Sequence, residues 1–140
     1  MPRPLMRSIS TIARCATLFR DENLACLGLN GYQAPYVPVI CAEPGITQEQ
    51  LAQRLHVNRS SVTRQLTLLE EGGFILRQRS EKDRRAMHVY PTQRMREALP
   101  EVLGTFARWR EALMEGLTQE ELCTLETLLD RLAGRAEEIR

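Results

Sequence analysis

Small polar side chains and one arginine share a face of the helix expected at residues 58–71. That face holds Ser60, Ser61, Thr63, Arg64 and Thr67, opposite an apolar stripe of Val62, Leu66 and Leu69 at helical spacing. Small hydroxyl groups permit a close approach to base edges, and an arginine can donate two parallel hydrogen bonds to a guanine. We therefore expect this face to read the major groove of duplex DNA, with Arg64 on a guanine. The alternative is that Arg64 contacts only a phosphate.

A cluster of charged residues at 79–85 forms a second candidate contact with DNA. Its members are Arg79, Lys82, Asp83, Arg84 and Arg85. An acidic group in a loop that faces DNA is unfavourable unless it orients a neighbouring side chain. Asp83 is therefore expected to pair with Arg77 or Arg79 and to fix the loop, which leaves Arg85 to enter a narrow, A·T-rich minor groove. The alternative is a mobile turn whose charges are only solvated.

Helix start and stop signals place the first cluster in a helix-turn-helix unit. Residues 47–50, Thr-Gln-Glu-Gln, have the pattern of a capping box and open a helix. Residues 56–58 form the turn, and Asn58 is a good N-cap for the second helix. Gly72 and Gly73 end that helix. Arg54 and Arg59 flank the turn, where we expect them to contact DNA phosphates rather than bases.

Alternating apolar and polar residues predict a β-hairpin directly after this unit. Met87 and Val89 alternate with His88 and Tyr90, so strands are expected at 74–79 and 86–90 with a turn between them. Helices are expected at 5–27, 32–42, 93–116 and 118–139. The predicted fold is mainly α with a small β-hairpin wing, as one domain over 1–140. It comprises a winged helix-turn-helix core at about 32–92 and N- and C-terminal dimerisation helices at 5–27 and 93–140.

Charge is distributed unevenly, although the whole chain carries a formal net charge of only +1. Residues 1–53 hold four Arg and four acidic residues and are neutral. Residues 54–96 hold nine Arg, one Lys and four acidic residues, for a net +6, and residues 97–140 have a net −5. A basic middle segment is typical of a phosphate-binding surface. The alternative is a solvated surface balanced by pairing within the chain.

The leucine-rich C-terminal segment predicts a homodimer. Its leucines are Leu122, Leu125, Leu128, Leu129 and Leu132. They exceed what one helix needs to dock on a small reading domain, although an intramolecular core is the alternative for any single leucine. One recognition helix touches too few base pairs for genomic selectivity. We therefore expect a two-fold dimer on a pseudo-palindromic operator in double-stranded DNA, with half-sites about one turn (~10 bp) apart.

The cysteines and histidines are too scattered to suggest a metal or another cofactor. Cys15, Cys26, Cys41 and Cys123 form no CxxC pair, and the chain has only two histidines. Neither a signal peptide nor an apolar run long enough for a membrane span is apparent, so a cytoplasmic protein without membrane contact is expected. In a reducing compartment the cysteines are buried small hydrophobes by default. A cysteine-based redox-sensing regulator is the sharper alternative.

Catalytic patterns are missing, so an enzyme is not expected. The sequence has no Ser/His/Asp, Cys/His or phosphate-loop arrangement, and two lone histidines offer little acid–base capacity. A winged-helix protein-interaction module without DNA binding is the competing class. Such a module predicts an apolar or acidic outer face on the helix at 58–71, whereas this face is small, polar and Arg-bearing.

Residues 50–92, QLAQRLHVNRSSVTRQLTLLEEGGFILRQRSEKDRRAMHVYPT, resemble the reading segment of the MarR family of bacterial winged-helix regulators. They match the family's recognition helix, its Arg-bearing strand and its wing, whose D-x-R pattern is here Asp83-Arg84-Arg85. The order of long N-terminal helix, reader and two C-terminal helices also matches, so the resemblance covers essentially the whole chain. It implies a homodimeric transcription regulator, more often a repressor.

The resemblance also implies a small phenolic or anionic effector, bound where the dimer region meets the reader. Tyr32, Tyr36, His56 and Arg14 are conceivable lining groups, although packing or surface roles are the alternative for each. Two departures from the family stand out. Residues 91–95 lack the Leu and Gly that usually follow the wing, and the position of the family's peroxide-sensing cysteine falls near Arg7. The resemblance therefore does not support a peroxide sensor.

Overall fold

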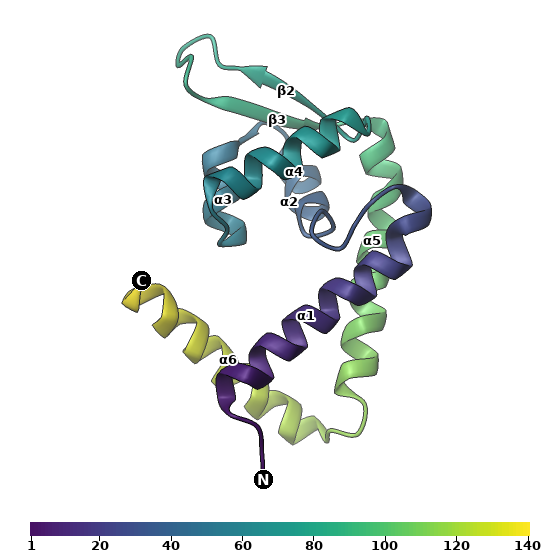
Figure 1. The fold of residues 1–140 in the computed structure, drawn as a ribbon, viewed down its shortest axis with the longest axis vertical. Coiled ribbons are helices and arrows are strands. Elements are labelled where there is room, and N and C mark those ends of the chain that lie inside the picture. The colour runs from purple at the N-terminus through teal and green to yellow at the C-terminus, as the bar shows by residue number, and fades with distance from the viewer. The chain divides into compact units, whose positions relative to one another are not determined.

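The computed structural model describes all residues from 1 to 140 and shows two compact units, Met1–Ala107 and Arg108–Arg140. The elements are α1 (Leu5–Leu24), η1 (Ala25–Leu27), α2 (Tyr36–Ala42), β1 (Ile46–Thr47), α3 (Gln48–Leu55), α4 (Arg59–Glu71), β2 (Ile75–Arg79), β3 (Met87–Pro91), α5 (Gln93–Met114) and α6 (Gln119–Ile139), which Figure 1 colours by residue number. The α5 helix crosses from the first unit into the second. The predicted fold class, mainly helical with a small wing, is confirmed.

The first predicted helix is present, with a tighter last turn than expected. It runs as α1 to Leu24 and continues for three residues as the 3-10 helix η1. Gly28 ends it with a φ of 82°, a left-handed conformation that glycine adopts without a steric penalty. The helical segment thus ends at Leu27, where the predicted helix at 5–27 ends.

The α2 helix begins later than predicted, at Tyr36 instead of residue 32. Upstream of it, the Asn30 side chain accepts hydrogen bonds from the backbone amides of Tyr32 and Gln33, both at 2.9 Å. Such local bonds stabilise a turn in place of a helix. Because of the late start, Pro38 lies in the first helical turn, where its missing amide has no intrahelical acceptor.

The helix-turn-helix unit follows the predicted caps. The Thr47 hydroxyl accepts from the Gln50 amide and the Gln50 side chain accepts from the Thr47 amide, which completes the capping box of α3. The Asn58 side chain accepts from the Ser61 amide and starts α4. The predicted stripe on α4 is buried, with Val62 1% exposed and Leu66 and Leu69 fully covered. This stripe orients α4 so that its polar face points outward.

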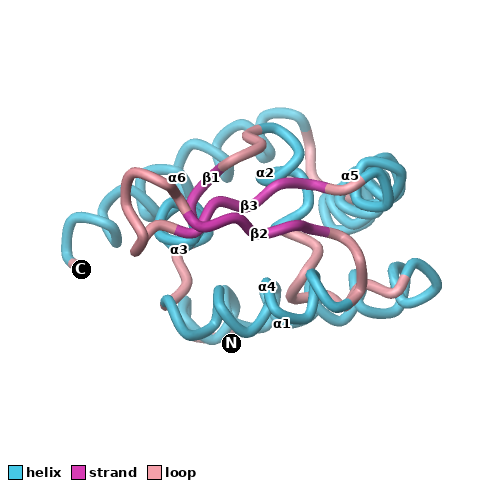
Figure 2. The backbone as a smooth tube through the Cα atoms, turned by 90° about the horizontal axis from the view of Figure 1, so that it is seen from above, coloured by secondary structure: helices cyan, strands magenta, loops and turns pink.

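The wing is part of a three-stranded sheet, not of an isolated hairpin. β2 and β3 pair as predicted, with Arg77 opposite Val89 and Arg79 opposite Met87. The short β1 was missed; it pairs with the other edge of β3, Ile46 opposite Val89, so the order is β1-β3-β2 (Figure 2). A two-residue strand has too short a pattern to be recognised, because period-two alternation needs at least four residues.

A single hydrophobic cluster joins the elements of the first unit. It includes Leu24 at the end of α1, Ile40 from α2, Leu51 from α3, Phe74 before β2 and Met95 from α5. Phe74 is 2% exposed and the other four are fully buried. The helix-turn-helix and the sheet are thus held on one core, which gives the outer face of α4 and the wing a defined relation.

The second unit consists of the end of α5 and the α6 helix. The Thr118 and Glu121 side chains form a capping box at the start of α6. The acceptance of two hydrogen bonds, from the Thr118 backbone and side chain, lowers the pKa of Glu121 below its ordinary value. Arg110 and Glu126 form an ion pair across this unit. No residue of α6 is buried, and Leu128, Leu129 and Leu132 are each more than two-fifths exposed.

Candidate nucleic-acid interface

The outer face of α4 carries one arginine whose side chain is free to meet a ligand. Arg64 is exposed and makes no hydrogen bond or ion pair within the chain. Ser60 is also exposed, but its hydroxyl donates a hydrogen bond to Oδ1 of the N-cap Asn58 at 2.7 Å. Ser61, next to it, is half-buried. An unpaired guanidinium flanked by small side chains can reach a base edge without first losing an internal partner.

Thr63 and Thr67 lie on the same face but are engaged within the chain. Their hydroxyls donate to the carbonyls of Arg59 and Thr63, at 3.0 and 2.9 Å. The oxygens also accept at 3.5 Å, Thr63 Oγ1 from Gln48 and Thr67 Oγ1 from Arg77. These two threonines therefore join α4 to its neighbours, a role that the local sequence pattern did not indicate.

Arg54 and Arg59 are tied to acidic neighbours at the surface. Arg54 pairs with Glu43, whose hydrogen bond raises the pKa of Arg54 above its ordinary value. Arg59 pairs with Glu49 at 3.0 Å, and its side chain is 80% exposed. Ion pairs this exposed contribute little, because water screens them and two long side chains lose freedom. Both arginines can therefore exchange a carboxylate for a phosphate at small cost.

The wing tip is an ordered turn built by two short side chains. The Ser80 hydroxyl accepts from the backbone amides of Lys82 and Asp83, at 3.3 and 3.2 Å. Oδ1 of Asp83 accepts from the Arg85 amide at 3.0 Å. All five charged residues from 81 to 85 are exposed.

The predicted pairing of Asp83 with Arg77 or Arg79 is wrong. Arg79 donates to the carbonyl oxygen of Arg84 at 2.7 Å, and Arg77 pairs with Glu70 on α4. In a turn, an aspartate side chain can accept from the backbone amide two residues on, which is the Asx-turn contact that Asp83 makes here. Asp83 therefore fixes the loop, as expected, but through the backbone beside Arg85.

The start of α4 and the wing tip line one cleft of about 380 Å³. Arg59 and Thr63 come from α4, Asp83 and Arg85 from the wing, and Gln48 and Glu49 from the start of α3. The two clusters identified in the sequence thus face the same space. The structure brings Arg59 at the start of α4 together with Arg85 of the wing, as a duplex lying against both elements requires.

The other candidate residues from the sequence are dispersed. Tyr36 belongs to the core, where burial raises the pKa of its phenol, whereas Tyr32, His56 and Arg14 are exposed. Cys15, Cys26 and Cys123 are exposed free thiols rather than buried hydrophobes, so the default expectation is wrong for these three. Cys41 is half-buried; burial raises the pKa of its thiol, and the charge of Arg96 opposes this.

Residues 1–140 contain neither a cluster of metal-binding side chains nor a helix that could span a membrane. No group of three or more His, Cys, Asp or Glu side chains is arranged to hold a metal ion. None of the helices has both the length and the apolar character that crossing a bilayer demands.

Two helices joined by a tight turn and followed by a basic hairpin define a winged helix-turn-helix protein, and comparison with known proteins agrees. A profile of the MarR family matches residues 40–87. The HTH-type transcriptional regulator BilQ of Clostridium symbiosum (strain WAL-14163) is 30% identical over 122 residues, which cover 87% of this chain and 84% of BilQ. The chain belongs to the MarR family of transcriptional regulators, so it is not expected to be an enzyme.

Solved structures share the same architecture. A crystal structure of MarR is 34% identical, with a TM-score of 0.88, and the match covers 100% of this chain and 97% of that one. The structure of the S. aureus MepR–DNA complex also has a TM-score of 0.88, covering 96% of this chain and 99% of the MepR chain, at 18% identity. At that identity the likeness to MepR concerns the fold alone.

Proposed function

We propose that this regulator binds a pseudo-palindromic operator in double-stranded DNA as a homodimer, in the cytoplasm. The observation that carries the proposal is the shared cleft: Arg59 of α4 and Arg85 of the wing face the same space. A recognition helix in the major groove and a wing over the adjacent minor groove need this arrangement. The MepR–DNA complex supports it, since a protein of the same fold binds DNA.

Each side chain then has a role set by its place. Arg64 projects from α4 without an internal partner and reads a base edge. Ser60, whose hydroxyl is bonded to Asn58, lies on the same face with Ser61, Thr63 and Thr67. The cations that flank this face neutralise phosphates; they are Arg54, Arg59, Arg79, Lys82 and Arg84. Arg85, held by Asp83 through its backbone, enters the minor groove. Phosphate contacts supply salt-dependent affinity and base contacts supply sequence preference.

Exposed apolar side chains on the terminal helices support the dimer. Leu128, Leu129 and Leu132 on α6 and Leu5 and Ile12 on α1 are all exposed in the single chain. A soluble monomer rarely leaves so many large apolar groups uncovered, and a second copy of the chain would bury them. The dimerisation helices would then be residues 5–27 and 93–140, which precede and follow the reader in the sequence.

More specifically, the protein would act as a repressor, and its affinity for the operator would fall when a small phenolic or anionic effector binds. The effector would change the spacing of the two recognition helices. A coupling free energy of about 1–3 kcal/mol between the two sites suffices for a response of tenfold or more. The resemblance to the MarR family supports this form, and a thermal-shift screen of phenolic and carboxylate compounds tests it.

The DNA-binding proposal is tested by selecting duplexes from a random library and titrating the preferred and a scrambled duplex by fluorescence anisotropy. We expect a much lower Kd for the preferred duplex and a steep decrease of affinity with salt, because several phosphates are neutralised. Light scattering should give the mass of two chains in free and DNA-bound protein. A salt slope near zero, or equal Kd values for both duplexes, contradicts sequence-specific DNA binding.

A further inference from the structure

Arg77 on β2 links the wing to the outer side of α4. We propose that Arg77 is a positioning residue for DNA binding: it fixes the wing against the recognition helix, so that Arg85 and Arg64 engage one duplex at the same time. This inference rests on the proposed function. Arg77 would not contact DNA itself but would act through Arg85 and Arg64, which would.

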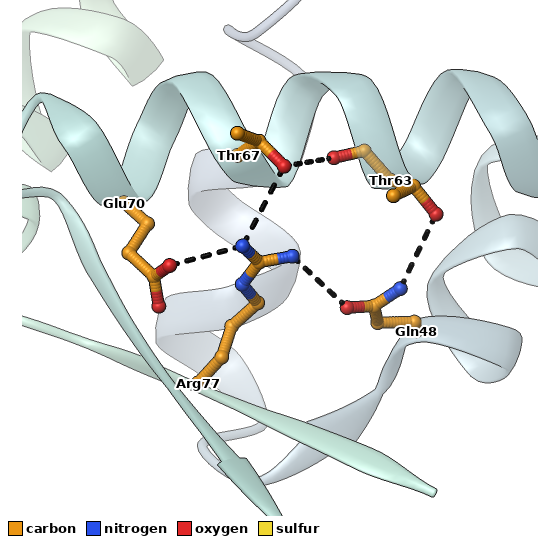
Figure 3. Close-up of polar contacts among 5 residues, drawn as sticks. All are labelled: Gln48, Thr63, Thr67, Glu70 and Arg77. Atoms are coloured by element: carbon orange, nitrogen blue, oxygen red, sulfur yellow. Dashed lines mark hydrogen bonds and ion pairs between the residues drawn. The ribbon is translucent and has the colours of Figure 1, made fainter. Parts of the chain in front are cut away.

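The guanidinium of Arg77 reaches three acceptors from two helices. Its Nη2 atom donates to Oε1 of Glu70 at 2.9 Å and to Oγ1 of Thr67 at 3.5 Å, and its Nη1 atom donates to Oε1 of Gln48 at 3.4 Å. Gln48 donates in turn to Thr63 at 3.5 Å. Figure 3 shows this network between the hairpin and α4, with the guanidinium pointing at the helix. The ion pair with Glu70 is the short contact, and the others are long.

Burial separates Arg77 from the cations that meet DNA. Its side chain is 17% exposed, whereas that of Arg59 is 80% exposed. A guanidinium presents its donors in a rigid planar fork, so acceptors in two directions hold it and its strand in one orientation. Two residues further along β2 lies Arg79, where the tip begins. Arg77 is thus placed to transmit the position of α4 to the wing tip.

Glu70 and Glu71 offer a matched pair of substitutions. They are the last two residues of α4. Replacing either one with Ala removes one negative charge from the same helix end, and this loss of charge by itself strengthens the attraction to DNA. Only Glu70 pairs with Arg77; Glu71 is exposed and forms no hydrogen bond or ion pair. If Arg77 positions the wing, Glu70→Ala weakens binding of the preferred duplex by about tenfold. Glu71→Ala leaves the Kd unchanged or lowers it.

Arg77→Lys keeps the charge and removes the fork, so it should reproduce the loss seen with Glu70→Ala. A double-mutant cycle then tests whether Arg77 affects DNA binding through the wing. Arg85→Ala should weaken binding less in the Glu70→Ala background than in the wild-type protein, because an unfixed wing contributes less. A purely structural role for Arg77 would lower the melting temperature but leave the effect of Arg85→Ala the same in both backgrounds.

The outcomes separate this inference from the function on which it rests. If the wild-type protein binds no duplex, the proposed function fails and this inference fails with it. If the wild-type protein binds, equal Kd values for Glu70→Ala and Glu71→Ala overturn the role of Arg77 alone. Full additivity of Glu70→Ala and Arg85→Ala likewise overturns it, because the two residues would then act independently.

Discussion

The guanidinium of Arg94 lies over the ring of Phe74, with 4.3 Å between its Cζ atom and the ring centroid. Arg94 also donates to the carbonyl oxygens of Gly72 and, at 3.5 Å, of Leu27. One side chain at the start of α5 therefore binds the end of α4 and the end of η1 above a buried ring. It closes the core at the point where three helices meet.

Arg94→Ala should lower the free energy of unfolding by about 1–2 kcal/mol. It removes a cation–π contact and a charge-assisted hydrogen bond to a helix end. Urea denaturation measures the change, and Arg96→Ala is the control, because it removes an exposed arginine from the same turn of α5. The control should shift stability by less than about 0.5 kcal/mol. Equal shifts in both variants would contradict a specific role for Arg94.

Arg64→Ala should relax base preference. The lost guanine contact costs about 1–3 kcal/mol on the preferred duplex and much less on a scrambled one, since only the former presents the right base edge. Competition titrations with single-base variants of the operator locate the affected position. A uniform loss on all duplexes would instead place Arg64 on a phosphate.

Arg85→Ala should weaken binding and make the dependence of affinity on salt shallower. The side chain is exposed and only its backbone is used within the chain, so the melting temperature should hardly change. Anisotropy at several salt concentrations and a thermal melt check both points. A large decrease in melting temperature would make Arg85 a structural residue.

Asp83→Ala and Asp83→Asn should differ, although both remove the same charge. Asparagine keeps an oxygen that accepts from the Arg85 amide, as Asp83 does at 3.0 Å, whereas alanine loses it. We expect Asp83→Asn to bind DNA at least as tightly as the wild-type protein and Asp83→Ala to bind severalfold more weakly than Asp83→Asn. Equal Kd values for the two variants would show that charge alone matters at the wing tip.

Acid should disconnect the wing from α4. The hydrogen bond from Arg77 lowers the pKa of Glu70 below its ordinary value of 4.5. A carboxyl with a lower pKa in the folded state stabilises the fold above its unfolded pKa, and this contribution disappears as the pH falls through the folded pKa. The ion pair between Arg77 and Glu70 is therefore intact at neutral pH and is lost at pH values below 4.5. An NMR titration of Glu70 should show its pKa return toward 4.5 in Arg77→Met.

Features that depend on residues close together in the sequence could be predicted from the sequence. The N-caps Thr47 and Asn58 were identified because each bonds an amide three residues ahead, wherever the rest of the chain lies. The buried stripe on α4 follows from helical spacing alone. In contrast, the start of α2 was misplaced, because the side chain of Asn30 competes with the helix for the backbone.

The sequence by itself thus determined the two helices of the reader, the hairpin and the side of α4 that faces outward, since these follow from local hydrogen bonds and periodicity. Only the tertiary structure decided which partners the charged groups take. Arg77 binds Gln48, which is 29 residues away in the chain, and β1 joins β3 across 43 residues. Any of several acidic groups could satisfy an arginine, so the choice is made by which surfaces the common core brings within reach.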